Sequence, residues 1–280
     1  MRCIASLTLV LSLAACEDNL THPPDRPDYE AEDTAPLPCV PNLDGRIEPS
    51  EMQAAVGIPV AYLISPAGVE RRVDVAGLVD PDGHLLWDWS TDFADDAVLR
   101  VSATQLADQW YADSFPEGQF VVPLDAAGTL DSIYRQDDDA LWLLGMASVQ
   151  PDPPEGRTLI AYTAPVAVFR FPIEPGSSWI SVGEVRDAVY RGLPYAGRDT
   201  YEVAVDGSGR LQLPDLEFTQ AHRVRTRVTA EPSVGAPTSR RQVSFLFECF
   251  GEVARATSRA DETEQDFTTA VEWRRFGLGL

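Results

Sequence analysis

Residues 218–257 read FTQAHRVRTRVTAEPSVGAPTSRRQVSFLFECFGEVARAT, two runs of alternating side chains around a loop with glycine and proline. Alternation with a period of two is typical of β-strands that bury one face. We expect strands over Phe218–Ala230 and Arg241–Thr257, with the loop Glu231–Ser239 between them. Two such strands joined by a loop pair as an antiparallel hairpin.

The register of this hairpin can be predicted from its apolar side chains, because a slip by an odd number of residues moves them to the other face. We expect Val224 to lie opposite Phe247 and Val228 opposite Val243. The same register places Arg223 opposite Glu248, so that opposite charges also meet across the strands.

Three arginines, Arg223, Arg225 and Arg227, then share the outward face of the first strand. Either they form an anion site, or they form an arginine ladder that pairs with acidic side chains on neighbouring strands. The ladder fits better, because the chain is very acidic. On this interpretation the four side chains, with Glu248, are surface ion-pairing residues.

Period-two runs bounded by Gly, Pro, Asp and Asn recur along the rest of the chain. The fold class is therefore mainly β, either an antiparallel β-sandwich or a strongly curved, partly closed barrel, with at most one or two short helices. We expect turns at Asp80–Gly83 and, joining two strands of a hairpin, at Asp206–Gly209. One short helix is predicted over Thr104–Ser114, and Gln150–Gly156 is a candidate boundary between two halves.

The charge balance restricts the partners. The chain has 280 residues, 44 acids and 22 bases, a formal net charge of −22, and no lysine. Such a charge repels phosphate backbones, so a nucleic-acid partner is excluded. No apolar run is long enough for a polytopic membrane protein.

The N-terminus has the order of a secretory signal, with Met1-Arg2, an apolar stretch Ile4–Ala15, and then Cys16. Leu13-Ala14-Ala15-Cys16 resembles the lipobox of bacterial lipoproteins. The resemblance implies cleavage before Cys16, acylation of that cysteine, and attachment to a membrane of the cell envelope, with the outer membrane favoured.

The expected organisation has three parts. Residues 1–15 form the signal peptide, 16–38 the lipidated cysteine with an acidic, proline-rich tether, and 39–280 one β domain. With Cys3 removed and Cys16 acylated, two thiols remain in an oxidising compartment. We therefore expect a disulfide between Cys39 and Cys249.

A partial metal motif follows Cys39. The loop Val40–Glu51 resembles the EF-hand calcium loop at Asn42, Asp44, Gly45, Ile47 and Glu51, although Val40 replaces its first aspartate. The calcium candidates are Asn42, Asp44, Glu48 and Glu51, and the alternative is an Asx turn. No other cofactor is expected.

Chemical motifs of known enzymes are absent from the sequence: there is no HExxH, GxSxG, P-loop or dinucleotide fingerprint. A hydrolase would need His84 or His222 beside a serine and a carboxylate. Trp87 and Trp89 share a strand face that could stack on a carbohydrate or lipid, but tryptophans of this kind are more often core. We predict that the protein is not an enzyme.

The whole layout, including the opening Cys39–Gly45 and the closing segment SFLFECFGEVARATSR, resembles uncharacterised lipoproteins of myxobacteria and their relatives. That resemblance implies an address and a class but no activity. We expect an envelope lipoprotein whose β domain binds a small apolar ligand or an envelope protein or glycan. The alternative is a calcium-stabilised adhesion or structural module.

Overall fold

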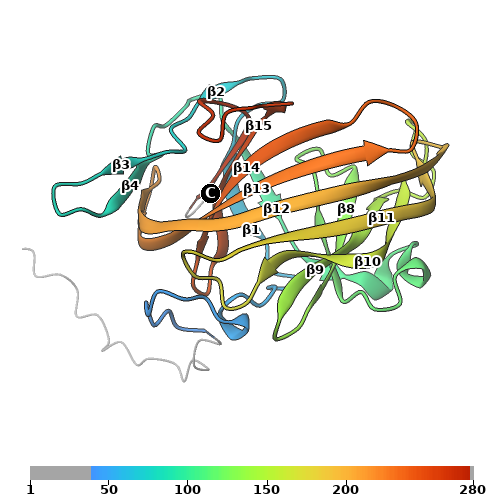
Figure 1. The fold of residues 1–280 in the computed structure, drawn as a ribbon, viewed down its shortest axis with the longest axis horizontal. Coiled ribbons are helices and arrows are strands. Elements are labelled where there is room, and N and C mark those ends of the chain that lie inside the picture. The colour runs from blue at the N-terminus through green and yellow to red at the C-terminus, as the bar shows by residue number, and fades with distance from the viewer. Residues whose placement is uncertain (1–38, 278–280) are drawn as a thin grey trace, which may run out of the picture. The chain divides into compact units, whose positions relative to one another are not determined.

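The computed structural model describes residues 39–277 (Figure 1). The expected signal peptide, the lipidation site Cys16 and the tether lie outside the described residues. The described chain is built of β-strands with three short 3₁₀ turns. Within it, no helix has the length and apolar character needed to span a bilayer.

Sixteen strands and three 3₁₀ turns form the described part of the domain. In chain order they are η1 (Pro49–Glu51), β1 (Val60–Ile64), β2 (Arg71–Arg72), β3 (Leu78–Val79), β4 (Leu85–Asp88), β5 (Ala97–Val101), β6 (Thr104–Gln105), η2 (Leu106–Asp108), η3 (Ala112–Ser114), β7 (Phe120–Pro123), β8 (Leu130–Gln136), β9 (Ala140–Ser148), β10 (Leu159–Arg170), β11 (Ser178–Tyr190), β12 (Leu193–Gln212), β13 (Glu217–Pro232), β14 (Thr238–Phe247), β15 (Gly251–Ala260) and β16 (Thr269–Phe276).

One large sheet runs through the molecule in the order β5-β1-β16-β15-β14-β13-β12-β11-β10-β9-β8-β7-β6. Every neighbouring pair on this path is antiparallel. The predicted mainly β, antiparallel fold is confirmed. Residues 150–156 are the loop between β9 and β10, which pair directly with each other.

The sheet curls until its two ends come close together. Its end strands, β5 and β6, are separated in the chain only by Ser102 and Ala103, so they must lie near each other. No strand pairing among residues 39–277 joins β5 to β6. The sheet is therefore strongly curved and open, and its concave face encloses an interior.

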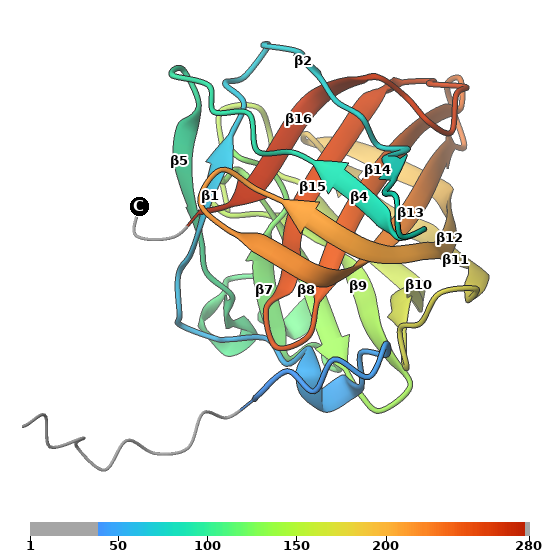
Figure 2. The ribbon, with the colours of Figure 1, turned by 90° about the vertical axis from the view of Figure 1, so that its left-hand side faces the viewer.

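Strand β12 bends at its glycines and passes from this sheet into a second layer. Its pairing with β13 shifts between Val205 and Gly207 and again between Gly209 and Leu211, as β-bulges do. The expected hairpin at Asp206–Gly209 is therefore wrong: one strand of 20 residues runs through that segment. Its last four residues pair in parallel with β4, and Figure 2 shows these strands lying across β14, β15 and β16.

The largest apolar core fills the space between the two layers. Trp87 and Trp89 of the β4 segment are fully buried there against Phe245, Trp273 and their neighbours. Of the two interpretations of the tryptophan pair, the structure supports the core. Three smaller apolar clusters lie on the interior face and around β7–β10.

The predicted register of the long hairpin is wrong by three residues. Val224 pairs with Ser244, and Arg225 pairs with Val243, because β13 continues to Pro232 and the connecting loop is shorter than expected. Arg241–Thr257 is also two strands, since Cys249 turns the chain with a φ of 66°. The odd slip puts Arg223 and Arg225 on the same face as the tryptophan core, and Val224 and Val228 on the interior face.

The helix expected over Thr104–Ser114 is also wrong. That segment holds β6 followed by η2 and η3, each of only three residues. Leu106, Tyr111 and Phe115 are buried at spacings set by these tight turns. Strand β8, which the sequence analysis did not predict, pairs with both β7 and β9.

Candidate functional site

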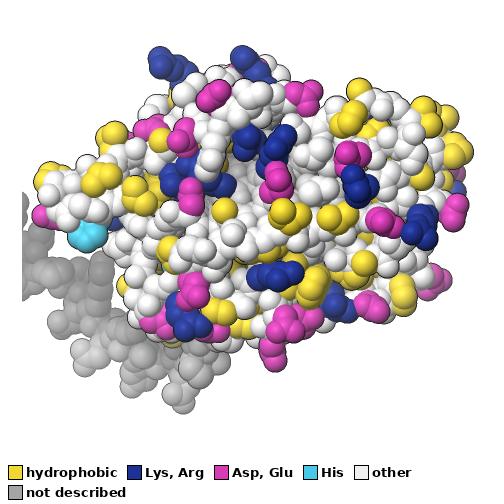
Figure 3. Space-filling model, viewed as in Figure 1, with side chains coloured by type: hydrophobic (Ala, Val, Ile, Leu, Met, Phe, Trp, Pro, Cys, Tyr) yellow, Lys and Arg dark blue, Asp and Glu magenta, His cyan; other side chains and the backbone are white. Residues whose placement is uncertain are grey.

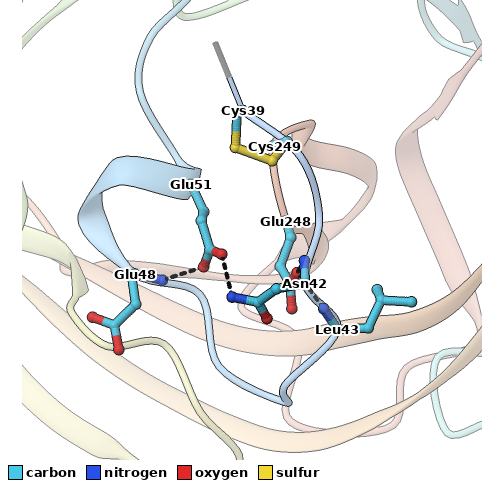
Figure 4. The surroundings of a disulfide bond; sticks show 7 residues. All are labelled: Cys39, Asn42, Leu43, Glu48, Glu51, Glu248 and Cys249. Atoms are coloured by element: carbon cyan, nitrogen blue, oxygen red, sulfur yellow. Dashed lines mark hydrogen bonds between the residues drawn. A yellow bond between two sulfur atoms is a disulfide. The ribbon is translucent and has the colours of Figure 1, made fainter. Parts of the chain in front are cut away.

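The loop with the calcium candidates is closed by its own hydrogen bonds (Figure 4). The Asn42 side-chain amide donates to Glu51 Oε1 at 2.9 Å, and Glu51 Oε2 accepts from the Glu48 backbone N–H at 2.9 Å. Asp44 Oδ1 accepts from the Arg46 backbone N–H at 3.0 Å. No group of three or more His, Cys, Asp or Glu side chains among residues 39–277 could hold a metal. The geometry matches the Asx-turn alternative, and calcium binding stays a prediction.

A disulfide joins Cys39 to Cys249, the pair expected from the sequence, with the two Cα atoms 5.6 Å apart. The neighbouring Glu248 was expected to face Arg223. It is instead buried beside the disulfide, and its Oε2 accepts the backbone N–H groups of Asn42 and Leu43 at 2.7 and 2.8 Å. Glu248 therefore fastens the first loop of the domain to the turn between β14 and β15, as Figure 4 shows.

The three arginines of β13 all have acidic partners within the chain. Asp206 accepts from Arg223 Nε at 2.7 Å and from Arg225 Nε at 2.6 Å, and both arginine side chains are about nine-tenths buried. Arg227 is half exposed and lies 3.5 Å from Glu202. This arrangement matches the ion-pair interpretation, although the first two arginines lie inside and not on the surface as expected. Elsewhere, Figure 3 shows acidic side chains beside most basic ones.

Neither histidine of the domain has the neighbours that the hydrolase alternative requires. His84 is largely exposed, with Nδ1 3.8 Å from Asp80 Oδ1. His222 is fully buried, and neither ring nitrogen has a hydrogen-bond partner among the described residues. Burial lowers the pKa of His222, and nearby Glu248 only partly offsets this effect. No hydrogen bond within residues 39–277 joins either ring to a serine.

The concave face of the sheet surrounds two adjoining cavities. The inner one has a volume of about 330 Å³ and the outer one about 640 Å³. Both values fall within the usual range for small-molecule sites. The two share lining residues from β12, β13, β14, β15 and the β7–β8 loop, namely Leu124, Tyr201, Val228, Gln242 and Arg255. The two cavities are therefore direct neighbours, with these five side chains in the walls of both.

One wall of the inner cavity is apolar. Its side chains come from β5, β7, β9, β10 and β13, strands that meet only because the sheet curls. They are Val101, Phe120, Val122, Leu124, Leu141, Leu143, Met146, Val168, Phe169 and Val228. Such a wall suits a hydrocarbon chain or a ring.

Other side chains that line the inner cavity carry charge. Arg255 of β15 donates from Nε to Glu252 Oε2 at 3.0 Å, and its Nη2 lies 2.8 Å from Glu252 Oε1. Ser244 Oγ also donates to Glu252 Oε2, at 2.8 Å. Burial alone would lower the pKa of Arg255, but the Glu252 carboxylate more than offsets this, so the pKa is raised and the guanidinium stays charged.

A second arginine lies directly across from the first. Arg274 of β16 is paired with Arg255 in the strand register, and its side chain is 5% exposed. Its Nε donates to Glu272 Oε1 at 2.8 Å. Two arginines and two glutamates thus form a charged cluster, in which Arg274 is buried and the other three side chains are partly exposed.

Tyrosines complete the polar side of the cavity. Tyr62 donates its hydroxyl to the Glu252 backbone carbonyl at 2.8 Å. Burial raises the pKa of Tyr62 and of Tyr201, so both hydroxyls remain protonated and can donate hydrogen bonds at neutral pH. The arrangement can bind a molecule that has an apolar body and a polar head, and nothing in it supplies an activated nucleophile.

Sequence reasoning missed every residue of this site. A usable signal was present in β16, where Arg274 and Arg275 are adjacent in a strand and must therefore lie on opposite faces. Charge on both faces indicates that neither face is a purely apolar core. Arg275 is fully buried on the other face and pairs with Asp96, while Arg274 lines the cavity.

Comparison with known proteins adds no relative: no family model, curated protein or solved structure matches the chain.

Proposed function

We propose that the protein is a non-enzymatic, lipid-anchored envelope protein whose β domain binds a small amphiphilic molecule inside the curved sheet. The anchor is supported by the lipobox-like Leu13–Cys16, and export by the disulfide, which forms and persists in oxidising compartments. The observation that carries the binding proposal is the cavity, which is lined both by apolar side chains and by members of the charged cluster.

The physical argument rests on the cost of an empty apolar cavity and of buried charge. Apolar cavity walls lose contacts that a ligand would restore, and burial of ligand hydrocarbon is favourable. A buried ion cluster contributes little to folding compared with apolar residues of the same size. A ligand with a hydrocarbon part and a polar head would fill the apolar cavity and form hydrogen bonds with the ion cluster.

A fluorescent amphiphile tests this function. The exported full chain is made soluble with Cys16→Ser and titrated with the probe. Val228 lines both cavities, so Val228→Trp should fill their junction and weaken binding at least about tenfold, whereas Val228→Ala should retain binding. Val182, which is 41% exposed on β11, supplies the matched control Val182→Trp. Equal binding by Val228→Trp and Val182→Trp would contradict the proposal.

A further inference from the structure

One buried nitrogen of the charged cluster has no hydrogen-bond partner among the described residues. Arg274 Nη2 is buried and has no hydrogen-bond partner within residues 39–277, although Arg274 Nε is bonded to Glu272. Arg274 lines the inner cavity. Buried donors without a partner are rare and costly, so this one calls for a ligand or water.

Arg255 is held more completely than Arg274. Glu252 accepts from two of its N–H groups, and Ser244 fixes Glu252 in turn. The side-chain partner of Arg274 among residues 39–277 is Glu272, which accepts from Nε. Of the two guanidinium groups in the cavity wall, that of Arg274 is the one with a buried nitrogen that has no hydrogen-bond partner among these residues.

An anionic group is the partner that this geometry favours. Arg255 and Arg274 are direct cross-strand neighbours, and each is paired with one glutamate, Arg255 through two N–H groups and Arg274 through one. A carboxylate near Arg274 would accept a further charge-assisted hydrogen bond, and the guanidinium fork suits carboxylates. A neutral head group would supply the hydrogen bond but not the charge.

We propose that the ligand of the cavity is an amphiphile with a carboxylate head that binds to Arg274, its hydrocarbon part lying against the apolar wall. This inference rests on the proposed function, since it names the ligand class of the same cavity. Arg274 is the residue that selects the head group. Arg255 and Glu252 keep the cluster charged and ordered around it.

Two probes with the same chain test the inference on the Cys16→Ser protein at pH 7.5: decanoate and decanol. Loss of one charge-assisted hydrogen bond corresponds to about tenfold or more in affinity, so decanoate should bind at least about tenfold more tightly than decanol. Arg274→Gln should remove that preference through weaker binding of decanoate. Arg186 of β11 is 72% exposed and lines neither cavity, so Arg186→Gln removes the same charge as a matched control and should keep the preference.

The outcomes separate the two proposals. If decanoate and decanol bind the unmodified cavity equally well, the carboxylate inference is overturned while the proposed function stands. If neither binds, the proposed function fails with it. The comparison of the two probes needs no variant at Arg274, so the test survives if Arg274→Gln does not fold. A preference lost equally in Arg186→Gln would overturn the role given to Arg274.

Discussion

Asp206 connects two buried arginines of β13. It lies at the bend of β12 and accepts from Arg223 and Arg225, while Arg223 Nη1 also donates to the backbone carbonyls of Val75 and Ala76. Arg223 therefore holds the covering segment at Val75–Ala76 against the sheet, and Arg225, which also pairs with Asp266, holds the segment 265–266. At this scale, the ion pairs of the domain act as structural links between layers.

Asp206→Asn should destabilise the domain by about 3 kcal/mol, because it leaves the buried Arg223 without a carboxylate partner, whereas Arg225 keeps Asp266. Glu202→Gln is the matched control, since it removes a carboxylate from the half-exposed Arg227 pair and should cost under about 1 kcal/mol. Urea unfolding measures both. Equal costs would show that the buried pairs do not hold the layers together.

His222 should make stability depend on pH. Burial lowers its folded-state pKa below its ordinary value of 6.5, so the folded protein binds fewer protons at this site than the unfolded chain does. The free energy of unfolding contributed by His222 is therefore fully present above about pH 6.5 and is lost as the pH falls toward the folded-state pKa.

His222→Gln isolates this effect, because the variant keeps the buried carboxylates and their own pH dependence. The difference in unfolding free energy between wild type and variant should move in favour of the variant as the pH falls from 7.5 to 5. Urea titrations at several pH values measure it. A difference that stays constant over this range would rule out His222 as the titrating group.

At the element scale, Gly209 allows two strands to approach where a side chain would not fit. A Cβ atom at Gly209 would lie 2.3 Å from the Leu85 backbone oxygen. Leu85 pairs with Gly209 in the parallel β4–β12 contact, so this oxygen cannot move without breaking the second layer.

Gly209→Ala should therefore cost about 1–3 kcal/mol, the range for overpacked sites, and should loosen the packing of Trp87 and Trp89. Ser208→Ala, one residue away and partly exposed, is the control and should change stability little. Urea unfolding and near-ultraviolet circular dichroism measure the two effects. Wild-type stability in Gly209→Ala would contradict the close approach.

Alternation predicted most strands at this scale, but it did not predict their connections. The sequence Asp206–Gly209 has the glycines of a hairpin turn, yet β12 uses them as bulges to bend without turning back. In the same way, alternation continues across Cys249, where a left-handed residue ends one strand and starts the next. Local propensity cannot distinguish these cases, because tertiary packing decides between a turn and a bend.

At the scale of the whole molecule, the disulfide and Glu248 fix the first loop of the domain to the turn between β14 and β15. The disulfide spans 210 residues. In the chain-entropy model, a loop of that length restricts the unfolded chain by about 5 kcal/mol, and measured losses run from about 2 to 5 kcal/mol.

Removal of the disulfide should lower the free energy of unfolding by about 2 to 5 kcal/mol. Cys39→Ser, Cys249→Ser and the double variant should all unfold at the same urea concentration, and reductant should bring the wild type to it while leaving the variants unchanged. If the wild type keeps its stability in reductant, its two cysteines should not react with a thiol reagent, because the disulfide is then still intact. Free thiols at unchanged stability would contradict this account.

The disulfide could be predicted from the sequence, because two cysteines remain after Cys3 and Cys16 and the expected compartment is oxidising. The cavity could not be predicted in this way. Its walls come from strands far apart in the chain, such as β5 and β13, and meet only through the curl of the sheet. The predicted register of β13 and β14 was wrong by three residues, so it also placed Val224 and Val228 on the wrong face of the sheet. An apolar interior was expected for a curved sheet, but the charged wall was not.

The central claim is that the interior of the sheet binds an amphiphilic molecule. The most direct test is native mass spectrometry of the exported Cys16→Ser protein, compared with the same protein carrying Val228→Trp. The account predicts that the wild-type protein carries an added mass of a small molecule that contains a carboxylate and a hydrocarbon part, and that Val228→Trp does not. A bare wild-type chain that also takes up no decanoate when it is supplied would contradict the account.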